Sequence, residues 1–158
     1  MTIKPYDHSM KPALVTMMTS YFPEVHADIP QEIIETKLID LIESQAEKKL
    51  IQVFIAFEGE IPAGFSIFQI DSQGSDWCKR EGWGFIREFY VFPDHRRRGT
   101  GRELAGFSKA KLTEMGVHNL YLTCDSSEQA ESFWQSCGWV KTASSASNGL
   151  TIFEIQEV

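Results

Sequence analysis

The stretch FYVFPDHRRRGTGREL, from Phe89 to Leu104, constrains the fold more than any other part of the sequence. Its first residues are apolar, aromatic or β-branched, which is typical of a buried strand. Its middle contains Gly99 and Gly101, and beyond them apolar residues recur at helical spacing. The stretch therefore predicts a central strand at 84–92 that leads through a glycine-containing loop into a helix at 101–115.

The predicted loop has the features of an anion-binding site. The first amides of a helix have no acceptor within the helix and lie at the positive end of its dipole, so they attract phosphate. Gly99 and Gly101 have no Cβ, which lets a phosphate approach the backbone. The chain has a formal net charge of -7, yet four arginines flank this loop: Arg96, Arg97, Arg98 and Arg102. This local reversal of charge predicts a polyanionic ligand such as a pyrophosphate.

Several other classes fit the sequence less well. The loop lacks the GxxxxGK[ST] and GxGxxG patterns, which argues against an NTPase or a dehydrogenase. An arginine cluster also fits a solvated surface or an RNA- or protein-interaction module, but the acidic total argues against nucleic acid. The three cysteines, Cys78, Cys124 and Cys137, are widely spaced and include no CxxC pair. The sequence therefore predicts neither a disulfide framework nor a metal site.

The pattern of the whole chain predicts one α+β (mixed α/β) domain over residues 1–158, in which helices cover both sides of one sheet. Besides the central strand and its helix, we expect a strand at 2–6, helices at 9–21 and from Pro30 to about Glu47, strands at 50–58 and 62–70, a strand at 118–124, a short helix before Gly138, and strands at 139–143 and 150–155.

Local patterns refine these elements. The pair Phe22-Pro23 is expected to end the first helix. Ser126 and Gln129 have the spacing of a capping box at the start of the last helix. The 71–84 segment is a predicted loop whose Trp77 and Trp83 either cap the core, which we favour, or line a substrate mouth. The second helix has one apolar stripe, formed by Ile34, Leu38, Leu41 and Ile42.

Two motifs resemble those of the GNAT N-acetyltransferase family. The run Arg96-Arg97-Arg98-Gly99-Thr100-Gly101 resembles the R/Q-x-x-G-x-G/A loop that holds the pyrophosphate of acetyl-CoA in that family, and the lead-in Val91-Phe92-Pro93-Asp94 is typical of it. Residues 127–139 resemble the family's later helix and its Y-x-x-x-G-F ending. The resemblance covers residues 50–158 well and the first two helices in position only. It implies a mostly antiparallel central sheet of about seven strands with helices on both faces.

The resemblance also implies roles for individual residues. Backbone groups of Phe89, Tyr90 and Val91 would bind the pantetheine arm where the fourth strand splays from the fifth, and the Val91 amide is a candidate to polarise the thioester carbonyl. The amides from Arg97 to Arg102 would receive the pyrophosphate, and the arginine side chains can meet the 3′-phosphate. Ser127 either binds the pantetheine or only caps its helix. The implied acetyl-CoA site is Phe89, Tyr90, Val91, Arg96, Arg97, Arg98, Gly99, Thr100, Gly101, Arg102, Ser127 and Trp134.

The implied reaction is direct attack of a neutral primary amine on acetyl-CoA. Glu88, just before the pantetheine-binding positions, is the candidate general base, and the alternative is a structural ion pair. Trp134 stands where the family usually has the tyrosine that protonates the thiolate, and an indole N–H is a donor only. Trp134 is therefore expected to pack or to line the CoA channel, with Tyr90 and Tyr121 as substitute acids. The alternative function is an acyl-CoA sensor on the same fold.

The expected acceptor is a small-molecule or peptide amine; a polyamine, an amino acid, an aminoglycoside and a protein N-terminus or lysine all remain open. The first two helices and the 71–84 loop are expected to determine specificity. No nucleic acid or membrane partner is predicted, and the resemblance allows a homodimer. The first residues lack a secretory signal pattern, and no stretch approaches the ~20 apolar residues of a membrane span, so we expect a cytoplasmic protein.

Overall fold

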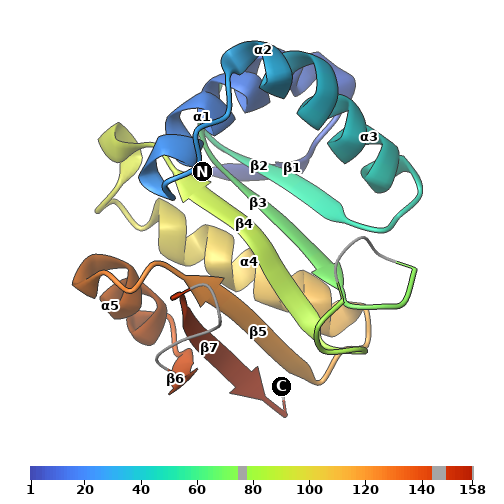
Figure 1. The fold of residues 1–158 in the computed structure, drawn as a ribbon. Helices are drawn as coiled ribbons and strands as arrows, with labels where there is room; N and C mark the ends of the chain where they lie inside the picture. The colour runs from blue at the N-terminus through green and yellow to red at the C-terminus, as the bar shows by residue number, and fades with distance from the viewer. Residues whose placement is uncertain (75–77, 144–148, 158) are drawn as a thin grey trace. The chain divides into compact units, whose positions relative to one another are not determined.

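The structure, a computed structural model, describes residues 1–74, 78–143 and 149–157 (Figure 1). Its strands are β1 (Thr2–Pro5), β2 (Gln52–Glu58), β3 (Ile61–Ile70), β4 (Gly84–Val91), β5 (Asn119–Cys124), β6 (Val140–Ala143) and β7 (Thr151–Gln156). Its helices are α1 (Lys11–Glu24), α2 (Gln31–Ile33), α3 (Ile39–Glu47), α4 (Thr100–Glu114) and α5 (Glu128–Ser136). Three shorter helical segments are η1 (His8–Met10), η2 (Ile34–Leu38) and η3 (Pro93–His95).

The seven strands form one sheet in the order β1-β2-β3-β4-β5-β7-β6. The pairs β1–β2, β5–β7 and β6–β7 are antiparallel, whereas β4 and β5 are parallel. The register of β4 with β5 joins the range Gly84–Ile86 to Leu120–Leu122. This arrangement confirms the predicted α+β class and the mostly antiparallel sheet of seven strands.

The residues divide into two compact units. The first unit comprises Met1–Ile67 and Glu88–Leu104, and the second comprises Phe68–Arg87 and Ala105–Val158. The strands β3 and β4 and the helix α4 contribute to both units. The single domain expected from the sequence stays a prediction.

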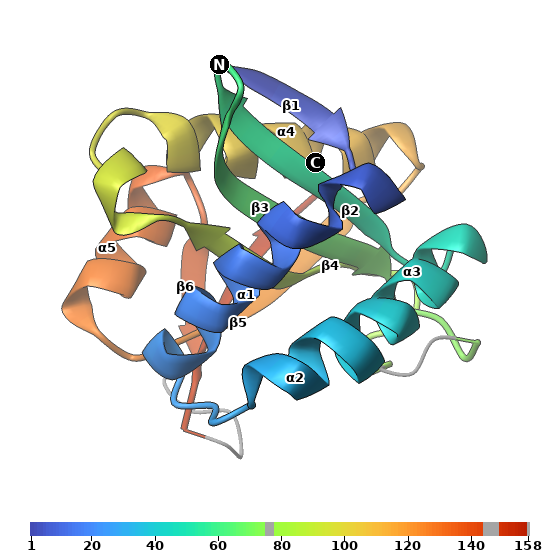
Figure 2. The ribbon, with the colours of Figure 1, turned by 90° about the horizontal axis from the view of Figure 1, so that it is seen from above.

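The core of the first unit forms where helices cover β2 and β3. Figure 2 shows α1 crossing these two strands, and apolar side chains of both layers pack together there. Each such side chain contributes about 1.5–3 kcal/mol by leaving water. The apolar side chains of α1 that lie in this core are Leu14, Val15, Met17, Met18, Tyr21 and Phe22. The fully or almost fully buried members of this core include Leu14, Met17, Met18, Ile34, Ile39, Ile55 and Phe65.

The first helix does not end at Phe22-Pro23 as the sequence predicts. It continues to Glu24, and Pro23 lies in its last turn. A proline removes one backbone donor and disfavours helical geometry at the residue before it. So close to the helix end little remains to be disrupted, and the amide of Val25 still donates to the Phe22 carbonyl at 3.1 Å.

The second predicted helix contains a π-helical segment, η2, between α2 and α3. A π turn takes up more residues than an α turn, so positions after it are displaced around the helix. Leu41, seven residues after Ile34, is consequently 46% exposed, while Ile39 and Ile42 are buried. The predicted stripe is wrong at Leu41 for this reason and right at Ile34 and Ile42.

The second unit is built around β5. On one face of this strand, Leu120 and Leu122 are buried. On the other face, the ring of Tyr121 stacks on Phe85 with centroids 4.6 Å apart. The helix α5 is capped by Ser127, whose hydroxyl accepts from the Ala130 amide at 3.2 Å.

The predicted capping box at Ser126 is wrong by one residue. The Ser126 hydroxyl donates to the Gly149 carbonyl at 2.9 Å instead. Its neighbour Ser127 takes the cap position because its extended backbone directs its own hydroxyl toward the first turn of the helix.

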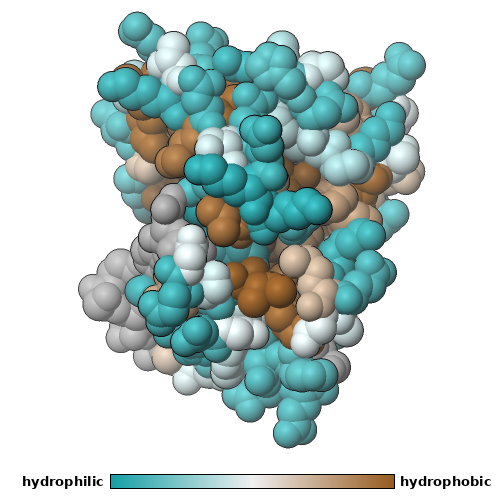
Figure 3. Space-filling model, turned by 90° about the vertical axis from the view of Figure 1, so that its right-hand side faces the viewer, coloured by the Kyte–Doolittle hydropathy of each residue, from teal (hydrophilic) through white to brown (hydrophobic). Residues whose placement is uncertain are grey.

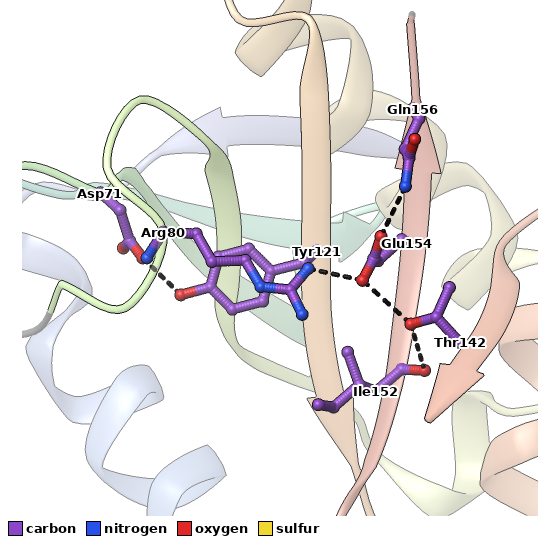
Figure 4. A network of polar contacts seen from close by, with 7 residues as sticks. All are labelled: Asp71, Arg80, Tyr121, Thr142, Ile152, Glu154 and Gln156. Atoms are coloured by element: carbon purple, nitrogen blue, oxygen red, sulfur yellow. Dashed lines mark hydrogen bonds and ion pairs between the residues drawn. The ribbon is translucent and has the colours of Figure 1, made fainter. Parts of the chain in front are cut away.

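A buried carboxylate organises the segment between β3 and β4 (Figure 4). Asp71 is fully buried and accepts from the Tyr121 hydroxyl and from the side-chain amide of Gln69. It also accepts from the backbone amides of Lys79 and Arg80, both at 3.1 Å. A buried charge needs such complete hydrogen bonding to be tolerated. Asp71 therefore ties the start of this segment to Lys79 and Arg80 in its later part.

Arg80 extends the same network. Its guanidinium donates to Glu154 at 2.6 Å and lies 4.8 Å from the ring centres of both Trp83 and Tyr121. Trp83, a member of the second unit, is partly buried and packs against Arg80 and Tyr121, and its predicted role in capping the core stays a prediction. Trp77 lies outside the described residues.

The surface is polar on the face that Figure 3 shows, where hydrophobic residues form small separate patches between hydrophilic ones. Within the described ranges, no helix is both long enough and apolar enough to cross a membrane.

Candidate functional site

The end of β4 is held close to β3 in the first unit. A Cβ added to Gly64 would lie 2.4 Å from the carbonyl oxygen of Tyr90 and 3.2 Å from Cα of Val91, so only glycine fits there. Beyond the strand, the amide of Phe92 donates to the Ala63 carbonyl at 2.8 Å. These contacts fix the backbone of Tyr90 and Val91, two of the predicted pantetheine-binding residues.

The loop after β4 adopts the geometry that the anion-site hypothesis requires. Arg97 and Gly99 have left-handed φ values of 63° and 86°, which turn the chain sharply into α4. The first helical bond runs from the Glu103 amide to the Gly99 carbonyl at 3.0 Å. The amides of Thr100 and Gly101 lie in the first turn, where a helix offers no acceptor of its own. No atom lies within 4 Å of where a Cβ of Gly99 would be, so the space beside the loop is open.

The arginines of the loop differ in what they contact. Arg96 donates from Nε to the Val91 carbonyl and from Nη2 to Glu24, both at 2.8 Å, and its guanidinium lies 5.5 Å from the centre of the Tyr90 ring. This side chain therefore ties the loop to the end of β4. By contrast, the side chains of Arg97, Arg98 and Arg102 are exposed. They are the arginines that can meet a ligand without breaking these contacts.

Glu58, at the end of β2, is a member of the site that sequence reasoning missed. Its carboxylate accepts from the Thr100 hydroxyl at 2.9 Å and from Arg98 at 3.2 Å, and it lies 2.9 Å from Nδ1 of His95. The interaction with His95, followed by that with Thr100, lowers the pKa of Glu58. From the sequence alone, Glu58 is only part of a predicted turn, because the residues that it contacts lie about forty positions later.

Glu88, the predicted base, is partly buried on β4 and accepts a hydrogen bond from the hydroxyl of Tyr21 on α1. Tyr21 is 8% exposed. Burial raises its pKa well above 10, and the charge and hydrogen bond of Glu88 raise it further. The phenol therefore remains protonated at neutral pH and acts as a donor to the carboxylate. No local pattern in the sequence indicates Tyr21 as the partner of Glu88.

Ser127 and Trp134 belong to the second unit. The Ser127 hydroxyl caps α5, which is one of its two predicted roles. Trp134 is 6% exposed, and its ring makes edge contacts with Phe133 at 4.9 Å and Trp139 at 5.6 Å. Trp134 is thus a packing residue, and the predicted contacts of both residues with CoA stay predictions. Over the part of the chain that the structure describes, no three His, Cys, Asp or Glu side chains group as metal ligands.

The sequence model of the acetyltransferase (GNAT) family matches residues 12–139, which is most of the chain. The chain belongs to the GNAT acetyltransferase family. The resemblance seen in the loop and in the C-terminal motif is therefore confirmed. As a member of the GNAT family, the chain belongs to the acyltransferase class of enzymes.

Solved GNAT structures share the fold. Ribosomal-protein-alanine N-acetyltransferase from Brucella melitensis is 15% identical with a TM-score of 0.76, over 99% of both chains. The paia N-acetyltransferase from Thermoplasma acidophilum, solved in complex with coenzyme A, is 14% identical with a TM-score of 0.73, again over 99% of both. The protein yncA from Salmonella typhimurium, solved with its cofactor acetyl-CoA, is 19% identical with a TM-score of 0.73, over 99% of this chain and 93% of that one. No curated protein matches the sequence.

Proposed function

We propose that this GNAT protein is an N-acetyltransferase that moves the acetyl group of acetyl-CoA onto a primary amine by direct attack. The observation that carries the proposal is the loop at 96–102, with its left-handed backbone at Arg97 and Gly99 and its open helix start. Two of the three structures described above were solved with CoA or acetyl-CoA, which supports the same cosubstrate here.

The loop fits a pyrophosphate. Its first-turn amides supply donors, the open space at Gly99 admits phosphate oxygens, and the exposed Arg97, Arg98 and Arg102 add positive charge. Glu58 holds the loop through the Thr100 hydroxyl and pairs with Arg98, and Arg96 ties the loop to the Val91 carbonyl. The pantetheine would then run along the backbone from Phe89 to Val91, with the Val91 amide at the thioester oxygen.

Glu88 is the proposed base. It takes a proton from the ammonium or attacking amine, directly or through a water, because only a neutral amine nitrogen is nucleophilic. A C–N bond forms at the thioester carbonyl carbon as the C–S bond breaks, so the products are the acetylated amine and CoA. The sulfur leaves as the thiolate or takes a proton from water. Trp134 cannot supply that proton, because its indole N–H is far too weak an acid.

Calorimetry of the whole chain with acetyl-CoA tests the binding half of this proposal. Gly99→Ala should weaken acetyl-CoA binding at least tenfold, because alanine resists a φ of 86° and the loop amides would turn away from the ligand. Gly116→Ala is the matched control, since Gly116 also has a left-handed φ, of 93°, with no atom within 4 Å of an added Cβ. No heat from acetyl-CoA or CoA with the unmodified chain would contradict the proposal.

Release of the CoA thiol with spermidine, L-alanine, kanamycin and a lysine-containing peptide tests the transfer half. Turnover with at least one of these amines is expected, and Glu88→Gln should lower kcat by about 10²–10⁴-fold, the usual contribution of a general base. Tight acetyl-CoA binding with no transfer to any of them would instead favour the acyl-CoA sensor.

A further inference from the structure

The pair formed by Tyr21 and Glu88 joins two elements of the first unit that are distant in sequence. Tyr21 lies on α1, Glu88 lies 67 residues later on β4, and the phenol hydroxyl donates to Oε2 of the carboxylate. Neither the loop motif nor the C-terminal motif of the family includes Tyr21, and the resemblance to the family assigns no residue on the first helix. The contact therefore requires its own explanation.

The ring of Tyr21 is held on three sides by other aromatic rings. Phe65 meets it edge-on at a centroid distance of 5.5 Å and an angle of 86°, Tyr90 lies at 5.5 Å, and Phe22 lies at 5.3 Å. A side chain packed in this way has little rotamer freedom. The hydroxyl is consequently presented to Glu88 from a fixed direction.

A glutamate on a strand is not fixed by its own geometry. Its three side-chain torsions leave the carboxylate free to point in several directions, whereas a general base must be held within hydrogen-bond reach of the proton that it removes. A donor fixed at one carboxylate oxygen limits the directions in which the carboxylate can point. The same hydrogen bond favours the ionised carboxylate, which is the form that accepts a proton.

We propose that Tyr21 is the positioning residue of the reaction: its hydroxyl orients the Glu88 carboxylate and keeps it ionised for removal of the amine proton. This inference rests on the proposed function, because it takes Glu88 as the base. Tyr21 is not itself a catalytic residue here, since it acts through Glu88 and keeps its own proton.

The charges around this cluster are consistent with the proposal. Burial and Glu88 together keep Tyr21 protonated, so its hydroxyl acts as a donor to the carboxylate. Among the described residues, Glu24 on α1 and Arg96 in the loop also border the aromatic cluster, at Tyr90. They pair with each other at 2.8 Å.

The substitution Tyr21→Phe isolates the hydroxyl, because phenylalanine keeps the ring and its three aromatic contacts. With the amine that gives the highest turnover in the panel above, kcat should fall about tenfold, while the KM for acetyl-CoA stays within twofold. The acid limb of the profile of kcat/KM against pH should move about one pH unit higher, because a carboxylate that loses a donor holds its proton more tightly.

The matched control is Tyr6→Phe. Tyr6 also donates to a glutamate, Glu43, at 2.9 Å, and burial likewise raises its pKa. This pair is not part of the candidate site, so Tyr6→Phe should leave kcat and the pH profile unchanged. An equal effect of both substitutions would show a general loss of stability and would overturn the proposal.

Two further measurements separate this inference from the proposed function. In the Glu88→Gln background, Tyr21→Phe should have no additional effect on kcat, because Tyr21 acts only through the carboxylate. Carbon-13 NMR of labelled glutamate, with the Glu88 signal assigned from Glu88→Gln, should show its titration midpoint rising about one pH unit in Tyr21→Phe. Full activity of Glu88→Gln would refute the base assignment. Loss of activity in Glu88→Gln together with unchanged kcat and midpoint in Tyr21→Phe would refute the inference alone.

Discussion

At the scale of single residues, Gly64 shows how the fold controls the site without touching a ligand. Gly64→Ala would place a Cβ 2.4 Å from the backbone oxygen of Tyr90, which cannot move aside as a flexible side chain could. We expect the free energy of unfolding to fall by about 1–3 kcal/mol, the usual range for forcing an extra carbon into a packed interior. Urea unfolding followed by circular dichroism measures this change.

The matched control for that prediction is Gly106→Ala in α4. A Cβ there meets no atom within 4 Å, and alanine favours a helix over glycine by about 0.5–1 kcal/mol. Gly106→Ala should therefore raise the free energy of unfolding. If both substitutions shift the free energy of unfolding in the same direction, the close approach of β3 and β4 is not the reason that position 64 requires glycine.

The residues of the site divide by whether their partners are near in sequence. The loop residues Arg97, Gly99 and Thr100 could be singled out because a strand, two glycines and a helix start follow one another along the chain. Glu58 and Tyr21 could not be singled out in this way, because the residue that each one contacts lies about forty or more positions away in the sequence. Pairing at such a separation depends on how the strands and helices pack, which no local pattern encodes.

At the scale of elements, the segment between β3 and β4 depends on the ion pair of Arg80 with Glu154. The side chain of Glu154 is 10% exposed and that of Arg80 is 28% exposed, so solvent screens the pair only in part. Arg80→Met would leave a largely buried carboxylate without its cation and would lower the free energy of unfolding by about 1–2 kcal/mol. Thermal unfolding measures this loss, and adding Glu154→Gln to the variant should recover part of it.

A surface pair provides the control for this prediction. Lys111 and Glu114 lie 3.3 Å apart on α4 and are 41% and 66% exposed. Lys111→Met should change stability by less than about 0.5 kcal/mol, as is usual for exposed pairs. Equal losses in Lys111→Met and Arg80→Met would mean that the network in Figure 4 contributes no more than a surface contact.

Most elements lie within a few residues of their predicted positions because their periodicity and turn residues are local signals. The hairpin of β2 and β3 turns at Gly59, and α4 begins one residue before Gly101. The errors occur where geometry departs from a regular repeat. The π segment η2 displaced Leu41, and the helix α1 tolerated Pro23 in its last turn.

At the scale of the whole molecule, four carboxylates among the described residues make stability depend on acid. Interaction with His95 and Thr100 lowers the pKa of Glu58, and hydrogen bonds from Thr151 and Lys141 lower that of Glu131. For Glu43 and Glu154, burial alone would raise the pKa, but hydrogen bonds outweigh it and the pKa is lowered.

A lowered pKa in the folded state means that the unfolded chain binds protons first as pH falls. The stabilisation is present above the unfolded value of about 4.3 and is lost as pH drops through the lower, folded values. The urea midpoint should therefore change little between pH 7 and 5 and fall between pH 4.5 and 3. Combining Glu131→Gln with Glu154→Gln should flatten that fall, and a midpoint that rises toward pH 3 would contradict the assignment.

The π segment η2 has a consequence for how this helix tolerates changes in length. A helix that gains one residue without breaking absorbs it as a single wide turn, so Ile34–Leu38 has the form that an insertion would leave. Removing one residue from the middle of this segment would let an ordinary α-helix form, because the buried Ile39 and Ile42 would then follow Ile34 by four and seven residues, the regular spacing of one helical face. Evolution or design can therefore shorten this helix by one residue while the core beneath Ile34 stays in place.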